Sequence, residues 1–141
     1  MTSRRLRSLE IEGLNHGSAP IPMGARVGNM IFTSGISGKN PKTGTLAEGA
    51  QAQAFHAFEN LRLLLENGGA TMADVGQVTV LTADESLRDA VNAEWVRHFP
   101  DPHDRPARHT TVQALRGGAL LQLIAIAALP RTADPLELEF P

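Results

Sequence analysis

An arginine between a proline-rich loop and a strand pattern is the residue best suited to bind an anion. The segment Arg105–Thr111 reads RPARHTT, so Arg108 stands where a rigid loop enters an expected strand. A guanidinium fixed there can grip a carboxylate through two parallel hydrogen bonds. Side chains alternate along a strand, so Arg108 and Thr110 should face one side and His109 the other. A solvated or salt-bridged arginine is the alternative.

A glutamine inside an apolar strand pattern is the second candidate. Gln122 interrupts the run Ala119–Leu129, which is otherwise aliphatic. Its side chain is either a hydrogen-bonded amide in the core or at a subunit contact, or a polar group in the wall of a pocket.

Several other kinds of site are excluded or disfavoured. The chain has no cysteine and no tyrosine, so it lacks thiolate nucleophiles, cysteine metal ligands and a phenolic acid. The segment His98–Asp104 (HFPDPHD) has no second ligand pair at helical spacing, so we interpret it as a solvated loop and expect no metal. No P-loop, GxGxxG, HExxH or nucleophile-elbow pattern occurs.

The composition is typical of one globular domain. The 141 residues (15.1 kDa) carry 13 Lys and Arg against 15 Asp and Glu, a net charge of -2. Proteins that bind nucleic-acid phosphates are usually basic, so no nucleic-acid partner is expected. The apolar run Ala119–Leu129 is about half as long as a membrane span, and no signal-peptide pattern follows the N-terminal arginines. We therefore expect no membrane partner and a cytoplasmic protein, in agreement with the lack of cysteine.

Strands and two helices must position these residues. The apolar spacing of Ala50–Asn67 predicts a helix that Gly68-Gly69 ends, and a second helix is expected between Asp84 and Pro100. Strands are expected over residues 9–12, 26–34, 74–81, 109–115 and 119–129, with loops over 13–24 and 35–49. The order β-β-α-β-α-β-β predicts an α+β fold, a mixed β-sheet with two helices on one face. A single domain covers 1–141, with a core of about 9–129, extensions at 1–8 and 130–141, and a candidate edge strand at 136–140.

Six short motifs follow one another along the chain: Ser34-Gly35, Asn40–Gly44 (NPKTG), Asn60, Val91-Asn92, Pro106–Arg108 and Leu123–Ala127 (LIAIA). In this order and spacing they resemble the RidA/YjgF family of imine and enamine deaminases, also called L-PSP endoribonuclease-like proteins. The resemblance covers about residues 15–129. It implies a chorismate-mutase-like sandwich that forms a homotrimer with ligand pockets at the subunit interfaces, without metal or organic cofactor.

The resemblance also implies roles for individual residues. Arg108 matches the family arginine that binds the substrate carboxylate, and Thr110 matches a small residue beside it. Ser34 and Gly35 match a pair that lines the pocket, and Asn92 matches a helix asparagine near it. Family members hydrolyse reactive 2-imino or enamino acids to 2-oxo acids and ammonia.

The sequence departs from the family at three places. Gln122 stands where the deaminases carry a glutamate, Ile36 stands where a glutamine follows Ser-Gly, and the stretch that usually holds a tyrosine is shortened to residues 23–26. A glutamate can take a proton from water, whereas a glutamine can only position that water. His16 precedes the shortened stretch and is a candidate replacement, with an exposed loop histidine as the alternative.

Two functions are consistent with these residues. The first is a homotrimeric deaminase in which Arg108 anchors a small carboxylated substrate while Gln122 and a backbone carbonyl hold the attacking water. The alternative is a non-catalytic trimer that binds a small acidic metabolite. Ribonuclease activity follows only from the older family name, and the net charge disfavours it.

Overall fold

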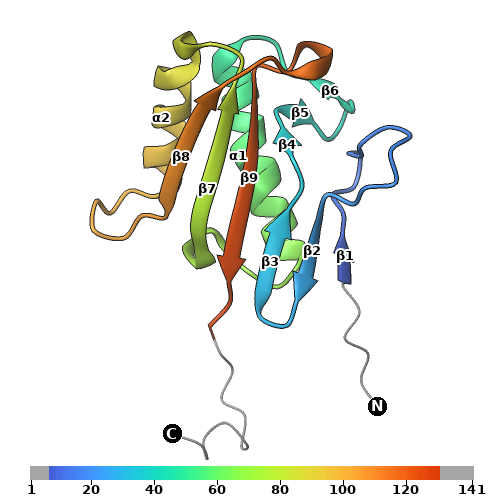
Figure 1. The fold of residues 1–141 in the computed structure, drawn as a ribbon, viewed down its shortest axis with the longest axis vertical. Coiled ribbons are helices and arrows are strands. Elements are labelled where there is room, and N and C mark those ends of the chain that lie inside the picture. The colour runs from blue at the N-terminus through green and yellow to red at the C-terminus, as the bar shows by residue number, and fades with distance from the viewer. Residues whose placement is uncertain (1–6, 131–141) are drawn as a thin grey trace, which may run out of the picture.

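A mixed sheet carries two helices on one of its faces (Figure 1). The structure, a computed structural model, describes residues 7–130. Its strands are β1 (Arg7–Leu9), β2 (Gly24–Val27), β3 (Met30–Thr33), β4 (Ile36–Ser37), β5 (Lys39–Asn40), β6 (Thr45–Leu46), β7 (Val75–Thr82), β8 (Ala107–Val112) and β9 (Leu121–Ala128). Its helices are α1 (Ala50–Asn67) and α2 (Arg88–His98), with 3-10 turns at Met72–Asp74, Glu85–Leu87 and Arg116–Gly118.

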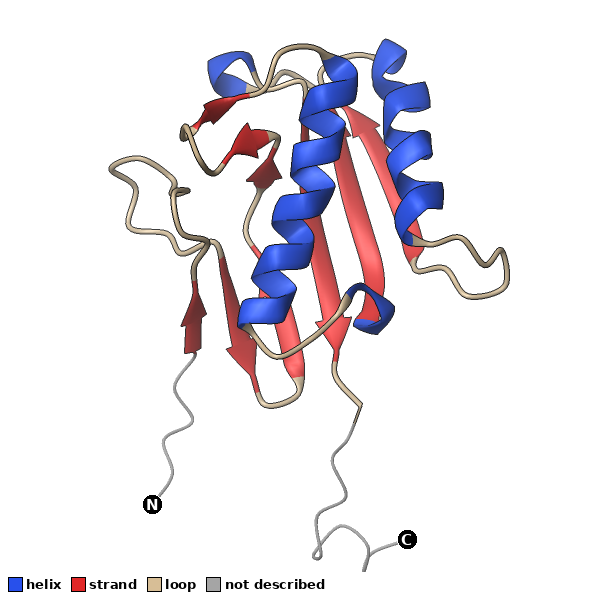
Figure 2. Cartoon of the chain, turned by 180° about the vertical axis from the view of Figure 1, so that it is seen from behind, coloured by secondary structure: helices blue, strands red, loops and turns tan. Residues whose placement is uncertain are grey.

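The sheet order explains why the fold is mixed. The strands lie in the order β1-β2-β3-β9-β7-β8, and β4 also pairs with β9, beyond the end of β3. β7 and β8 are parallel because α2 carries the chain back between them, and the other pairings within residues 7–130 are antiparallel. Figure 2 shows α1 and α2 in front of the same face of the sheet. The prediction of an α+β fold with both helices on one face is confirmed.

Helix α1 has the bounds that its apolar spacing predicted. Four residues of the apolar stripe are fully buried: Ala54, Phe58, Leu61 and Leu65. The helix ends where Gly69 adopts a φ of 90° and the Ala70 N–H donates to the Leu65 carbonyl at 2.8 Å. Burying Phe58 or one of these leucines stabilises the fold by about 1.5–3 kcal/mol, so the stripe anchors α1 on the sheet.

The single strand predicted over residues 26–34 is wrong. β2 and β3 form a hairpin there, and Gly28 has a φ of 59° in the turn. Glycine takes this conformation without steric cost, so Gly28 and Asn29 can reverse the chain between two β-rich segments. The sequence pattern did not predict this turn, because the residues on both sides of it favour strands.

Other strand boundaries also move. β1 occupies Arg7–Leu9 rather than 9–12, β8 occupies Ala107–Val112 rather than 109–115, and β9 starts at Leu121. The predicted loop 35–49 contains the short strands β4, β5 and β6. The candidate strand at 136–140 lies outside the described residues. No helix within residues 7–130 is long and apolar enough to cross a membrane.

Strand β9 separates a covered face from an open one. Leu121, Leu123, Ala125 and Ala127 are buried beneath the helices, whereas the alternate residues 122, 124, 126 and 128 point to the uncovered face. Residues paired across β7, β8 and β9 point to the same face of the sheet. The pairing therefore shows which face each site residue occupies.

Candidate functional site

Arg108 lies on the edge strand β8 and faces α2. The register pairs Arg108 with Val78 and Thr110 with Val80, and both valines are buried beneath the helices. Arg108 Nε donates to Thr110 Oγ1 at 3.0 Å, and Nη1 donates to Asn92 Oδ1 at 2.8 Å. The structure therefore brings together three of the predicted site residues, Arg108, Thr110 and Asn92, which we call the Arg108 cluster.

The guanidinium of Arg108 is oriented but has no counter-ion among the described residues. Its Cζ lies 5.1 Å from the centroid of the Trp95 ring. No carboxylate forms an ion pair with it in the part of the chain that the structure describes. Burial, and then the positive charge of Arg88, lowers the pKa of Arg108 from its usual value. A bound anion would offset both effects, and Nη2 has no partner within residues 7–130.

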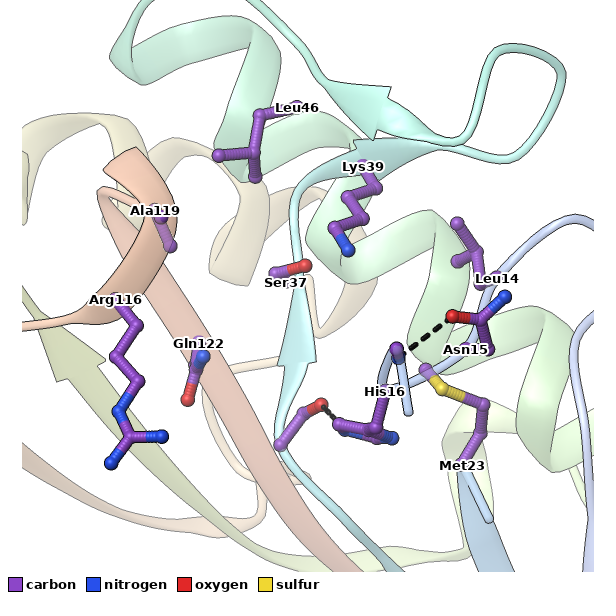
Figure 3. Close-up of a pocket in the computed structure, with 13 residues that line it drawn as sticks. Leu14, Asn15, His16, Met23, Ser37, Lys39, Leu46, Arg116, Ala119 and Gln122 are labelled. Atoms are coloured by element: carbon purple, nitrogen blue, oxygen red, sulfur yellow. Dashed lines mark hydrogen bonds between the residues drawn. The ribbon is translucent and has the colours of Figure 1, made fainter. Parts of the chain in front are cut away.

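Gln122 lies on the opposite face of the sheet. It pairs with Leu81 of β7, which pairs with Thr111 of β8. Arg108 is an odd number of residues from Thr111 on the same strand, so its side chain points to the other face. Gln122 contributes to the wall of a cavity of about 330 Å³, the Gln122 pocket, between β9, β4 and the loop at residues 14–17 (Figure 3).

A break between β3 and β4 shapes this pocket. Thr33 Oγ1 accepts the Ala125 N–H at 2.8 Å, and the chain leaves β9 before rejoining it at Ile36. Gly35 lies in the break. A Cβ on Gly35 would lie 3.0 Å from Gln122 Oε1, so the glycine leaves room for the Gln122 side chain.

Two buried polar residues of α1 fix the pocket wall. Asn60 Nδ2 donates to the Ser37 carbonyl at 3.1 Å and to the Lys39 carbonyl at 2.8 Å. Gln53 Oε1 accepts the Leu120 N–H at 2.9 Å. These bonds tie β4, β5 and the start of β9 to one rigid helix. The sequence marked Asn60 only as part of a motif, and it gave no signal for Gln53.

His16 is part of the Gln122 pocket. Its Nε2 lies 3.0 Å from the Gly35 carbonyl oxygen, which can only accept, so Nε2 carries the proton. In the neutral ring Nδ1 is then the unprotonated nitrogen, and it is buried without a partner in the described structure. The half-buried ring favours the pocket position over an exposed loop. His109 is exposed beside Thr79 on the open face and does not line this pocket.

The predicted residue Ser34 makes a loop contact, and two cationic residues outside the predicted site line the Gln122 pocket. Ser34 directs its Oγ to the Pro22 carbonyl at 2.7 Å, so its hydroxyl closes a loop. Lys39 and Arg116 line the Gln122 pocket and were missed, because both lie in stretches interpreted as loop or turn.

The HFPDPHD segment does not gather its side chains. His98 stacks on Phe58 of α1 at 5.5 Å between ring centroids, while the His103 N–H donates to Asp101 Oδ1 at 2.9 Å in a turn. Among residues 7–130 no group of three His, Asp or Glu side chains is arranged to hold a metal ion.

A family model, curated relatives and solved structures all match this chain. The family model described as Endoribonuclease L-PSP matches residues 19–129. A RutC family protein of Haemophilus influenzae is 37% identical over 82 residues, which are 58% of this chain and 63% of that protein, so less than two thirds of that relative is matched. The 2-iminobutanoate/2-iminopropanoate deaminase of Escherichia coli K12 is 30% identical over 95 residues, 67% of this chain and 74% of that protein. The crystal structure of the Escherichia coli YjgF gene product superposes with a TM-score of 0.78 at 30% identity, covering 86% of this chain and 98% of the other.

Proposed function

Because this chain belongs to the endoribonuclease L-PSP family, which includes RidA and YjgF, we propose that it hydrolyses reactive 2-imino or enamino acids, or a related small carboxylated imine. The products are a 2-oxo acid and ammonia. One observation carries the proposal: Arg108 is oriented by Asn92 and Thr110 and has no carboxylate partner within residues 7–130. The proposed compartment is the cytoplasm, where a chain without cysteine is unaffected by reducing conditions.

The proposed ligand site lies between two protomers of a homotrimer. Arg108 and Gln122 point to opposite faces, so a small ligand that touches both needs two chains. The open face also exposes large apolar side chains, at 40% for Val27, 41% for Phe32 and 37% for Ile124. Assembly would remove this apolar surface from water.

Each residue has a defined task in the proposed reaction. Arg108 binds the substrate carboxylate and so orients the C=N carbon, which is already electrophilic when the imine is protonated. Gln122 of the neighbouring protomer holds a water, whose oxygen forms a bond to that carbon. His16 of the same neighbouring protomer is the candidate that takes a proton from this water and returns it to the nitrogen, after its buried Nδ1 has turned toward the water. The C–N bond then breaks, the hydroxyl proton passes to the departing ammonia, and the C–OH becomes the carbonyl of the 2-oxo acid.

Ammonia release from freshly generated 2-imino acids tests this function. The protein should accelerate release over buffer, and Arg108→Ala should lower kcat/KM by at least about tenfold because a charge-assisted contact is lost. Lys42→Ala, in an exposed turn outside both sites, is the control and should match the parent. Equal rates with and without the parent protein would contradict the proposal.

A specific observation favours the binding protein as a second candidate. Within residues 7–130 no aspartate or glutamate lines the Gln122 pocket, so none of the described carboxylates can act there as a general base. In that case the protein binds 2-oxo acids through Arg108 but does not release ammonia from imines. Binding and release measured on the same preparation separate the two functions.

A further inference from the structure

The Gln122 pocket carries positive charge that the proposed reaction does not use. Lys39 of β5 and Arg116 of the turn Arg116–Gly118 both line it, together with His16. Among the described residues no acidic side chain lines it, although the chain as a whole has a net charge of -2. The charge of this pocket wall is therefore opposite in sign to the net charge of the chain.

Both cations are unpaired in the described structure. Neither Lys39 Nζ nor the Arg116 guanidinium has a carboxylate or other hydrogen-bond partner within residues 7–130. Elsewhere the chain pairs such groups, since Arg62 and Arg97 each lie 2.9 Å from a Glu59 oxygen. Unpaired cations around a concave wall focus a positive potential and attract anions.

Neutral hydrogen-bonding groups lie between these cations. Figure 3 shows Gln122 and Ser37 between Arg116 on one side and Lys39 on the other, with the Lys39 ammonium directed toward Ser37. The Ser37 hydroxyl and the Gln122 amide can both donate a hydrogen bond, and neither carries a negative charge. This wall can therefore solvate an anion without repelling it.

The pocket is also larger than the smallest substrates require. Its volume of about 330 Å³ lies at the lower end of the range of about 300–1,000 Å³ that is typical of small-molecule pockets. A 2-imino acid of three or four carbons with one attacking water occupies less than this volume. The space is sufficient for a ligand that extends beyond the C=N carbon.

We propose that the Gln122 pocket binds a second anionic group, so that the ligand of this protein is a dianion. It would be a 2-imino acid, or the matching 2-oxo acid, whose far end carries a carboxylate or a phosphate between Lys39 and Arg116. The inference rests on the proposed function only at its Arg108 end, because Lys39 and Arg116 attract an anion whether or not the protein hydrolyses imines.

Calorimetric titration with matched probes tests the proposal. 2-Oxopentanoate and 2-oxoglutarate have the same five-carbon chain and differ by one carboxylate. The parent protein should bind 2-oxoglutarate tighter by on the order of tenfold, the effect of a charged hydrogen bond, and salt should reduce this preference. Phosphonopyruvate is titrated as a third probe. If it binds more tightly than 2-oxoglutarate, the second anionic group of the ligand is phosphate-like.

Charge-removing variants locate the subsite. Lys39→Gln and Arg116→Gln should each lower the preference for the dianion by at least about threefold while leaving 2-oxopentanoate binding nearly unchanged, since each loses one partly exposed cation. Binding of 2-oxopentanoate shows that each variant is folded. Lys42→Gln removes a nearby exposed cation outside the pocket and should keep the preference.

Two outcomes would overturn the inference: equal affinity of the parent for both five-carbon probes, or a preference that survives in the Lys39→Gln, Arg116→Gln double variant. Failure of the proposed function has a different signature. If Arg108→Ala binds both probes like the parent while the Lys39 and Arg116 variants lose the preference, the subsite is supported and the role of Arg108 is wrong.

Discussion

Arg108 and Gln122 lie on opposite faces of one sheet, Arg108 toward α2 and Gln122 toward the open face. Each chain therefore presents an oriented guanidinium on one side and a polar pocket on the other. In the proposed trimer each protomer would contribute one half to each of two sites, and no isolated chain would hold a complete one.

The planar guanidinium of Arg108 should contribute more to ligand binding than its positive charge alone. Arg108→Lys keeps the charge but loses the bonds to Thr110 and Asn92, so binding of a 2-oxo acid should weaken about tenfold, and about a hundredfold in Arg108→Ala. Stability should change little, by about 0.5–1 kcal/mol for the lost stacking on Trp95. Calorimetric titration and thermal unfolding measure the two effects. Parent-like affinity in both variants would show that Arg108 binds no ligand.

Restoring a carboxylate at position 122 should increase hydrolysis. Gln122→Glu supplies a general base, an effect typically of about 10²–10⁴-fold, and should add a pH limb to the rate. Partial burial opposes the charge of the new carboxylate, whereas Lys39 and Arg116 in the same pocket favour it. The same change should weaken binding of a dianion through repulsion. An unchanged rate in an intact assembly would mean that Gln122 is a structural amide or that the natural reaction is a different one.

Elements with a local signal were predictable from sequence. The three- and four-residue spacing of the apolar residues in α1 and the glycines after it determine the helix within a short window, so its bounds were predicted. Arg108 and Thr110 were placed on one side of a strand by alternation alone, and the bond between them agrees. The β2–β3 hairpin was missed because Gly28 and Asn29 interrupt a stretch of strand-forming residues without changing its apolar pattern.

Features that depend on distant residues were not predictable. The Gln122 pocket joins His16, Lys39 and Arg116, which are far apart in sequence and meet only through the pairing of β4 with β9 and the bonds from α1. The opposite orientation of Arg108 and Gln122 depends on the register across β7, which no single segment encodes.

The helix pair should lose stability in mild acid through His98. This ring stacks on Phe58, and its Nε2 lies 3.0 Å from Arg97 Nη2, 3.5 Å from Glu59 Oε2 and 3.8 Å from Glu94 Oε1. Burial, and then the charge of Arg97, lowers the pKa of His98 from its usual value of 6.5. The unfolded chain then binds more protons, so the free energy of unfolding falls as the pH drops below 6.5 and toward the lowered pKa.

Urea unfolding between pH 5 and pH 8 measures this effect. His98→Phe keeps an aromatic ring against Phe58 but cannot be protonated, so its stability should decline less steeply below neutral pH. His103→Gln, at an exposed turn, is the matched control and should keep the slope of the parent. Identical slopes in the parent and His98→Phe would contradict the assignment.

The proposed homotrimer should be detectable in dilute solution. Light scattering should give about three times the chain mass of 15.1 kDa, because the open sheet face is expected to be buried between protomers. A monomer at micromolar concentration would exclude a site shared between chains.

Mixed assemblies test the shared site most directly. Arg108→Ala and Gln122→Leu homotrimers should each show less than about a tenth of the parent activity, because each lacks one half of every site. In trimers assembled from equal amounts of both variants, about a quarter of the interfaces combine an intact Arg108 with an intact Gln122 from the neighbouring chain. We therefore predict recovery of ammonia release to about a quarter of the parent rate on mixing. A mixture no more active than the separate variants would contradict a site built from two chains.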